Sequence, residues 1–227
     1  MNSTQRFIVE NQGEDQQAVR VLIGTAAAYA LKQGLTRLTL VVPTKGQFPH
    51  SIIAHYLGAQ ATRALSKGQS VDIVTGLSLA LETPRNLKHN GGYGLVMATY
   101  LSRSDMGLLD STAAVAAIAY LPWTEEDGKN WMATWQPTPW GPCSWVVKPW
   151  VLPGEVEDEL QRLTRVINLS TGLANANDKD LAIRVLRSLR ASGFQLEGER
   201  VRSWAIKHGW VARHADELAR LSERYCT

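Results

Sequence analysis

The chain has 227 residues, of which 44% are hydrophobic and 20% are charged, and its formal net charge is +3 at pH 7. These values are ordinary for a globular protein, so they exclude a disordered, low-complexity or fibrous chain, and the weak positive charge does not by itself require a polyanionic partner. The sequence has no apolar run of transmembrane length and no apolar core of a secretory signal near its start, so we expect no membrane association.

The first part of the chain alternates apolar runs of strand length with helical segments. RFIVE at residues 6–10 is predicted to be a strand, followed by a long alanine-rich helix that ends at Gly34. RLTLVVPT at residues 37–44 is rich in β-branched residues and predicts a buried strand, and residues 50–67 predict a helix. SVDIVTG at residues 70–76 predicts a third strand.

The next segments continue the alternation. Residues 77–83 are interpreted as one or two helical turns, stopped by Pro84. YGLVMATYL at residues 93–101 predicts a strand, and AAVAAIAYL at residues 113–121 predicts a fifth, with a loop or short helix between them. Strands that alternate with helices in this way predict a mostly parallel sheet with helices on both of its faces.

The chain changes character after residue 121. A helix is expected from Thr124 to Trp135, with Thr124 as its N-cap and three acids in its first turn, and SWVVKPWVL at residues 144–152 predicts a strand or an extended arm. Only helical patterns follow. The predicted fold is therefore a Rossmann-like three-layer α/β/α domain at residues 1–152, with a sheet of about five to six strands, and an all-helical C-terminal subdomain at residues 153–227.

The predicted strand ends are the expected place for a ligand, because open α/β sheets bind ligands beyond the carboxyl ends of their strands. The loops there carry hydroxyl, basic and acidic side chains, and the hydroxyls, the basic groups and the helix N-termini could receive a phosphate or carboxylate. The candidate ligand-binding residues are Thr44, Lys45, Thr75, Thr99, Ser102, Arg103, Asp105, Glu126 and Asp127. The leading hypothesis is a protein that binds a nucleotide-like or other small anionic ligand at this edge.

No motif in the sequence identifies a reaction. The first predicted strand is followed by ENQGED, which matches neither GxxxxGK[ST] nor GxGxxG, and neither HExxH nor GxSxG occurs. The sequence therefore predicts no metal site, and it leaves the catalytic residues, the cofactor and any enzymatic activity open. Cys143 and Cys226 lie far apart and are predicted to be reduced thiols of a cytoplasmic protein.

Two alternative functions are retained. Six tryptophans lie from Trp123 to Trp150, interspersed with prolines, and they are interpreted first as packing residues. If the cluster is exposed, it favours a non-catalytic accessory subunit that docks a protein partner or a second copy of the chain. The C-terminal helices could instead bind nucleic acid, although acids interleave with the basic residues. The candidate residues for nucleic acid are Arg184, Arg187, Arg200, Arg202, Lys207 and Arg213.

Overall fold

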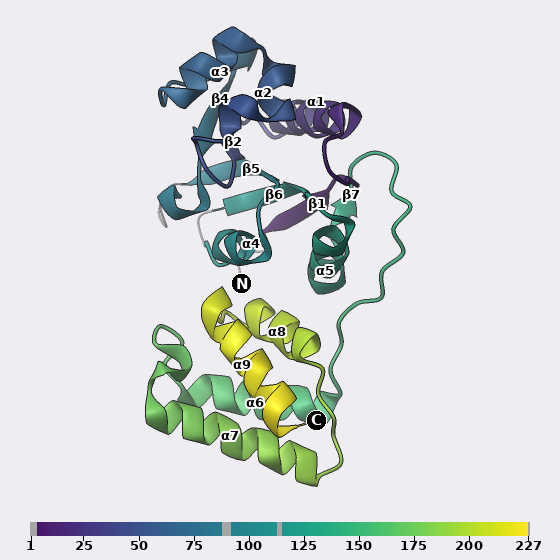
Figure 1. The fold of residues 1–227 in the computed structure, drawn as a ribbon, viewed down its shortest axis with the longest axis vertical. Helices are drawn as coiled ribbons and strands as arrows, with labels where there is room; N and C mark the ends of the chain where they lie inside the picture. Colours follow the sequence, from purple (N-terminus) through teal and green to yellow (C-terminus); the bar gives the residue numbers. More distant parts are fainter. Residues whose placement is uncertain (1–3, 88–91, 113–114, 227) are drawn as a thin grey trace. The chain divides into compact units, whose positions relative to one another are not determined.

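The computed structural model describes residues 4–87, 92–112 and 115–226, and the chain divides into two compact units, residues 1–148 and 149–227. The first unit combines a sheet with helices, and the second is helical (Figure 1). Both observations agree with the predicted α/β class and the predicted helical C-terminal region.

The sheet of the first unit contains, among the described residues, seven strands in the order β3-β4-β2-β5-β6-β1-β7. Neighbouring strands are parallel except for β3 and β4, which are antiparallel, so the prediction of a mostly parallel sheet is confirmed. The strands are β1 (Gln5–Ile8), β2 (Arg37–Val41), β3 (Val71–Val74), β4 (Leu77–Glu82), β5 (Tyr93–Thr99), β6 (Val115–Leu121) and β7 (Thr138–Pro139).

Helices cover both faces of this sheet. Alternate residues of a strand point to opposite faces, so neighbouring residues of the central strands belong to two different cores. Leu95 and Met97 of β5 belong to a core with α1 (Gln16–Lys32), α2 (Ile52–Leu57) and α3 (Ala59–Ser66). Val96 and Ala98 belong to a second core with α4 (Arg103–Asp110) and α5 (Glu125–Trp135). Short 3₁₀ turns lie at η1 (Phe48–His50) and η2 (Pro84–Asn86).

Residues 77–83 do not form helical turns, so that prediction was wrong. Leu77–Glu82 is strand β4, which pairs in parallel with β2 from Arg37–Ser78 to Val41–Glu82. Leu77, Leu79 and Leu81 are buried, and this alternation is the strand pattern that the helix-favouring leucines and alanine obscured. Burial on the sheet outweighs the weak local preference for helix.

Two further segments differ in detail from the predictions. The helix expected at residues 50–67 is interrupted at Gly58, whose φ of 84° is left-handed and separates α2 from α3. Residues 144–152 form no regular element, so they are the extended arm and not the strand. Two residues at the start of the predicted fifth strand, 113 and 114, lie outside the described part of the chain.

The second unit is a group of helices: α6 (Gly154–Val166), η3 (Gly172–Ala174), α7 (Ala176–Ala191), α8 (Gly198–Lys207) and α9 (Ala212–Tyr225). Buried leucines line their contacts, and the indole N–H of Trp210 donates to the Thr164 hydroxyl at 2.9 Å. The end of α9 is fixed to the turn after α7, because the backbone N–H of Leu196 donates to the Cys226 carbonyl at 3.1 Å. Among the described residues, no helix has both the length and the apolar character needed to cross a bilayer.

Candidate functional site

The predicted residues at the ends of β2 and β5 are engaged with neighbouring protein groups. Thr44 donates its hydroxyl to the side-chain oxygen of Gln47 at 3.0 Å, and the Lys45 ammonium pairs with the Glu82 carboxylate at 3.4 Å. Thr99 is fully buried, and its hydroxyl donates to the Val41 carbonyl at 3.1 Å. The Lys45 and Thr99 contacts join adjacent strand ends, and the Thr44 bond stabilises the loop after β2.

The predicted residues in the loops after β5 and β6 are largely helix caps. Ser102 is the N-cap of α4: its hydroxyl accepts from the Asp105 backbone N–H at 3.2 Å and donates to the Asp105 carboxylate at 2.9 Å. Thr124 and Asp127 make the same reciprocal pair at the start of α5, at 3.1 and 2.6 Å, which confirms Thr124 as the N-cap. Glu126 is exposed in that first turn, and Arg103, the first residue of α4, also has an interaction partner.

Thr75 does not lie with the other candidates. It belongs to the turn between β3 and β4, and because β3 runs antiparallel, this turn lies at the edge where the parallel strands begin. Its placement at the carboxyl edge was therefore wrong, since that inference assumed a parallel third strand.

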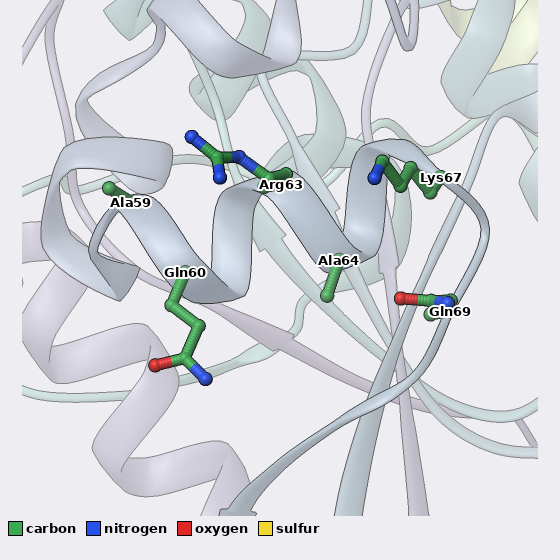
Figure 2. A pocket seen from close by; sticks show the side chains of 6 residues that line it. All are labelled: Ala59, Gln60, Arg63, Ala64, Lys67 and Gln69. Carbon is green, nitrogen blue, oxygen red and sulfur yellow. The ribbon is translucent and has the colours of Figure 1, made fainter.

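Among the residues that the structure describes, surface hollows lie elsewhere, and none of the nine candidate residues lines the four considered next. Two flank α3 and have volumes of about 490 and 570 Å³, and both share Ala59, Arg63 and Lys67. Figure 2 shows Arg63 and Gln60 extending from opposite sides of α3. The polar side chains that line the hollow of Figure 2 are exposed, so it lacks the buried polar groups that orient a ligand. The other two hollows lie where β1, β2 and β5 begin.

A different pair of residues at the carboxyl edge has buried polar atoms without a partner. Asn11, which follows β1, is only 4% exposed; its amide nitrogen donates to the carbonyls of Gly13 at 2.9 Å and Pro122 at 2.6 Å, but its side-chain oxygen has no hydrogen bond. The hydroxyl of Tyr100, which follows β5, is likewise buried and without a hydrogen bond. Such atoms are uncommon in folded proteins, because leaving one unpaired costs about 1–3 kcal/mol.

Both side chains lie beside the dipeptide that follows β6. Asn11 bonds to Pro122, and the ring of Tyr100 meets the ring of Trp123 edge to face, with centroids 5.1 Å apart. The Gly13 backbone N–H also donates to the Trp123 carbonyl at 2.8 Å. Three adjacent strands, β5, β6 and β1, therefore bring these residues together, and we name Asn11, Tyr100 and Trp123 the strand-end triad.

Backbone conformation and charge set this triad apart from its surroundings. Tyr100 has a φ of 56°, which is a left-handed backbone conformation. A non-glycine residue adopts this conformation only at a cost in free energy, and residues strained in this way occur often at functional sites. Burial, together with the negative charges of Glu14 and Asp15, raises the pKa of Tyr100 to about 12. The phenol is therefore neutral at pH 7 and lies in a negative potential.

The sequence analysis placed a ligand at the strand ends and selected Thr99, but it selected neither Asn11 nor Tyr100. An asparagine directly after a buried strand was the available signal, because its short amide commonly ties neighbouring loops together. The environments of both side chains depend on contacts between residues distant in the sequence, such as the Asn11–Pro122 bond and the Tyr100–Trp123 ring contact.

The tryptophans of α5 serve packing. The indole N–H groups of Trp131 and Trp135 both donate to one oxygen of Asp110 at 3.0 Å, and Arg6 donates to the other oxygen at 3.2 Å while its guanidinium covers the Trp135 ring. Burial raises the pKa of Asp110, and the Arg6 charge and the indole donors oppose that effect. We name Arg6, Asp110, Trp131 and Trp135 the Asp110 cluster.

The extended arm and the residues just before it pack against the first unit. The ring of Trp140, which precedes the arm, stacks on Phe7 of β1 with centroids 4.5 Å apart, and the ring of Trp145, in the arm, lies against Gly128 of α5. Within the predicted partner-docking region, Trp123 is 44% exposed and Val146 is 94% exposed. The side chains of Trp131, Trp135, Trp140 and Trp145 thus pack within the first unit.

Ser144, the first residue of the arm, and Cys143, which precedes it, contact the Glu10 carboxylate. Ser144 donates both its backbone N–H and its hydroxyl to Glu10, the latter at 2.7 Å. Burial raises the pKa of Glu10, but these bonds outweigh it and hold that pKa below its usual value. Burial raises the pKa of the Cys143 thiol, which disfavours the nucleophilic thiolate. The described residues contain no group of three or more metal-ligating side chains.

The predicted nucleic-acid residues separate into two groups. The first is occupied or partly buried: Arg202 pairs with Asp216 at 2.5 Å, Arg200 pairs with Glu197 at 3.0 Å, and burial lowers the pKa of Lys207. Arg213 donates to the ring of its buried neighbour, His214, at 3.2 Å. The second group, Arg184 and Arg187, is exposed on α7.

Comparison with known proteins yields one partial match. Residues 156–226 match the family model described as Domain of unknown function (DUF1889), and the match lies within the helical unit. No curated protein and no solved structure matches the chain.

Proposed function

We propose that the first unit is a Rossmann-like ligand-binding domain that takes a nucleotide-like small molecule beyond the carboxyl ends of β5, β6 and β1, and recognises it through an aromatic ring that bears an amino group. The observation that carries this proposal is the pair of unpaired buried atoms, the side-chain oxygen of Asn11 and the hydroxyl of Tyr100, on neighbouring strand ends. The free thiols of Cys143 and Cys226 support the expected cytoplasmic location.

The chemistry of the triad favours a hydrogen-bond donor. The Asn11 amide nitrogen is already used twice, so its orientation is determined and its oxygen is left as an acceptor. The Tyr100 hydroxyl can accept as well as donate. Glu14 and Asp15 add negative charge near that hydroxyl, which favours an amino group and disfavours a phosphate.

The aromatic rings supply the second part of the argument. Trp123 is 44% exposed and packs against the Tyr100 ring in a T-shaped contact, so it offers apolar ring surface next to the acceptors. A heteroaromatic amine such as adenine presents an amino donor at the edge of a flat ring. The anionic half of the original hypothesis has less support, because the hydroxyls of Thr44, Thr99 and Ser102 are bonded within the protein.

Adenosine and inosine test the proposal, because they differ by an amino against an oxo group on the same ring. The full chain is titrated with each nucleoside, and binding is measured by calorimetry and by the shift in Tm. We expect adenosine to bind and to raise Tm, and inosine to bind at least tenfold more weakly, which corresponds to about 1.4 kcal/mol, the scale of one hydrogen bond.

Tyr100→Phe removes one hydroxyl and keeps the ring, so we expect it to weaken adenosine binding about five- to tenfold. Tyr29→Phe is the matched control, because it removes an exposed hydroxyl that donates to the Gln5 side chain, at the opposite end of β1 from Asn11. Failure of adenosine to bind at millimolar concentration, or equal binding by the Tyr100→Phe variant, would refute the proposal.

A further inference from the structure

The C-terminal ends of α7 and α9 gather exposed arginines at one corner of the helical unit. Figure 1 shows both helices ending at the same side of that unit, and the bond from the Leu196 N–H to the Cys226 carbonyl ties the two ends together. Arg187 and Arg190 of α7 and Arg224 of α9 are all exposed at this corner. We name Arg184, Arg187, Arg190 and Arg224, with Tyr225, the arginine corner.

Contacts with Tyr225 hold two of these guanidinium groups in position. Arg187 and Arg224 lie over the Tyr225 ring at 5.0 and 5.2 Å from its centroid, so a single aromatic ring joins α7 to α9. The positive charge of Arg190 is felt at Cys226, whose pKa it lowers against the raising effect of burial. The charges therefore converge from two helices on the last residues of α9.

The arginine corner has unused binding capacity. None of its four arginines forms an ion pair with any residue that the structure describes, whereas Arg200 and Arg202, elsewhere in the helical unit, do. The neighbouring acid, Glu223, lies against Gly198 in the first turn of α8. The arginines consequently keep their donors for an external anion.

The spacing along α7 favours a polymer over a single anion. Arg184, Arg187 and Arg190 follow one another at intervals of three residues, which places successive charges about 4.5 Å apart along the helix axis. All four positions are arginine, whose planar group binds phosphate in a bidentate manner and stacks on aromatic and base rings. A chain of evenly repeated phosphates fits this arrangement better than one small anion.

From this geometry we infer that the arginine corner binds the phosphate backbone of single-stranded nucleic acid. The inference goes beyond the ligand proposed for the first unit and involves different residues, so either can fail without the other. It also lies within residues 156–226, the segment that matches the family model.

Salt dependence provides the test. Four phosphate contacts predict a slope of about −2.8 in log K against log salt for a single strand, so binding should weaken about 50-fold between about 50 and 200 mM salt. Arg187→Gln/Arg224→Gln leaves two contacts, and its slope should fall to about −1.4, or about sevenfold over the same range. Fluorescence anisotropy of a labelled 20-nucleotide DNA with the full chain measures both.

Arg162→Gln/Arg165→Gln is the matched control, because it removes the same charge from the exposed face of α6. We expect the control to keep the full slope, and Arg187→Lys/Arg224→Lys to keep most of it. Circular dichroism verifies that each variant is folded. The inference is overturned by an absence of binding at 50 mM salt, by equal loss in the control, or by displacement of the DNA by polyglutamate as readily as by unlabelled DNA, which would assign the corner to acidic protein segments.

Discussion

Asp110→Asn is expected to destabilise the first unit strongly while hardly changing its shape. The side chain of Asp110 is 4% exposed and that of Arg6 is 14% exposed, so the substitution leaves a largely buried guanidinium without its counter-charge. Removing one member of a buried ion pair costs about 3–5 kcal/mol. The indole donors of Trp131 and Trp135 retain an oxygen acceptor, and Arg6 keeps some access to water, so we expect about 3 kcal/mol, a large part of the 5–15 kcal/mol typical of a domain.

The raised pKa of Asp110 sharpens this expectation. Burial disfavours the charged form of Asp110. We therefore attribute the expected loss in the free energy of unfolding to the Arg6 guanidinium, which Asp110→Asn leaves largely buried without a counter-charge. Arg6→Met/Asp110→Asn should therefore cost less than the sum of the two single variants, by at least about 1.5 kcal/mol.

Urea unfolding, followed by tryptophan fluorescence and circular dichroism and fitted with a transition for each unit, measures these free energies. Glu126→Gln is the control: it makes the same neutralising change at an exposed position of α5 and should cost less than about 0.5 kcal/mol. A cost below about 1 kcal/mol for Asp110→Asn, or strict additivity in the double variant, would show that the cluster does not act as a buried ion pair.

Two further predictions concern the packing of the arm and the ionisation of the strand-end triad. Gly128→Ala places a methyl group against the Trp145 ring, which must move, so we expect a loss of about 1–3 kcal/mol and faster proteolysis of the arm. Gly24→Ala, where an added methyl group meets nothing, should be neutral or stabilising, and equal behaviour of the two variants would contradict the packing argument. The pKa of Tyr100 is raised from 10.0 to about 12, so its neutral form stabilises the fold below pH 10, and this contribution is lost as the pH rises from 10 to about 12. Wild type should lose stability relative to Tyr100→Phe over that range, by less than about 1.4 kcal/mol per pH unit because the phenol is partly solvated; parallel pH profiles in alkaline unfolding would rule out the shift.

Local patterns predicted most of the secondary structure, because local interactions dominate where the period is clear. The alanine-rich helix before Gly34, the apolar strands that became β2, β5 and β6, and the helices after residue 153 were all readable. The sequence also predicted that Thr124 caps the start of α5, and the structure shows reciprocal hydrogen bonds between Thr124 and Asp127 there. Spacing within a few residues is sufficient for each of these features.

The predictions failed where pairing across the sheet decides the outcome. LSLALE favours a helix by propensity, yet it is a strand because β2 on one side and β3 on the other complete its hydrogen bonds. Thr75 was misplaced for the same reason, because only the antiparallel pairing of β3 reveals which edge it occupies. Nothing in the local sequence predicts that Asp110 accepts bonds from residues 104, 21 and 25 positions away.

The strand order has a consequence for how the chain folds during synthesis. β1 is made first, but its partners are β6 and β7, more than one hundred residues later, while β2 and β5 pair elsewhere in the sheet. A nascent chain that has reached residue 100 can join β2 to β4 and β5, yet β1 still has no neighbour to complete its backbone hydrogen bonds. Closure of the first unit must wait for β6, so Phe7 and Ile8 of β1 remain exposed to aggregation or chaperone capture for the longest part of translation.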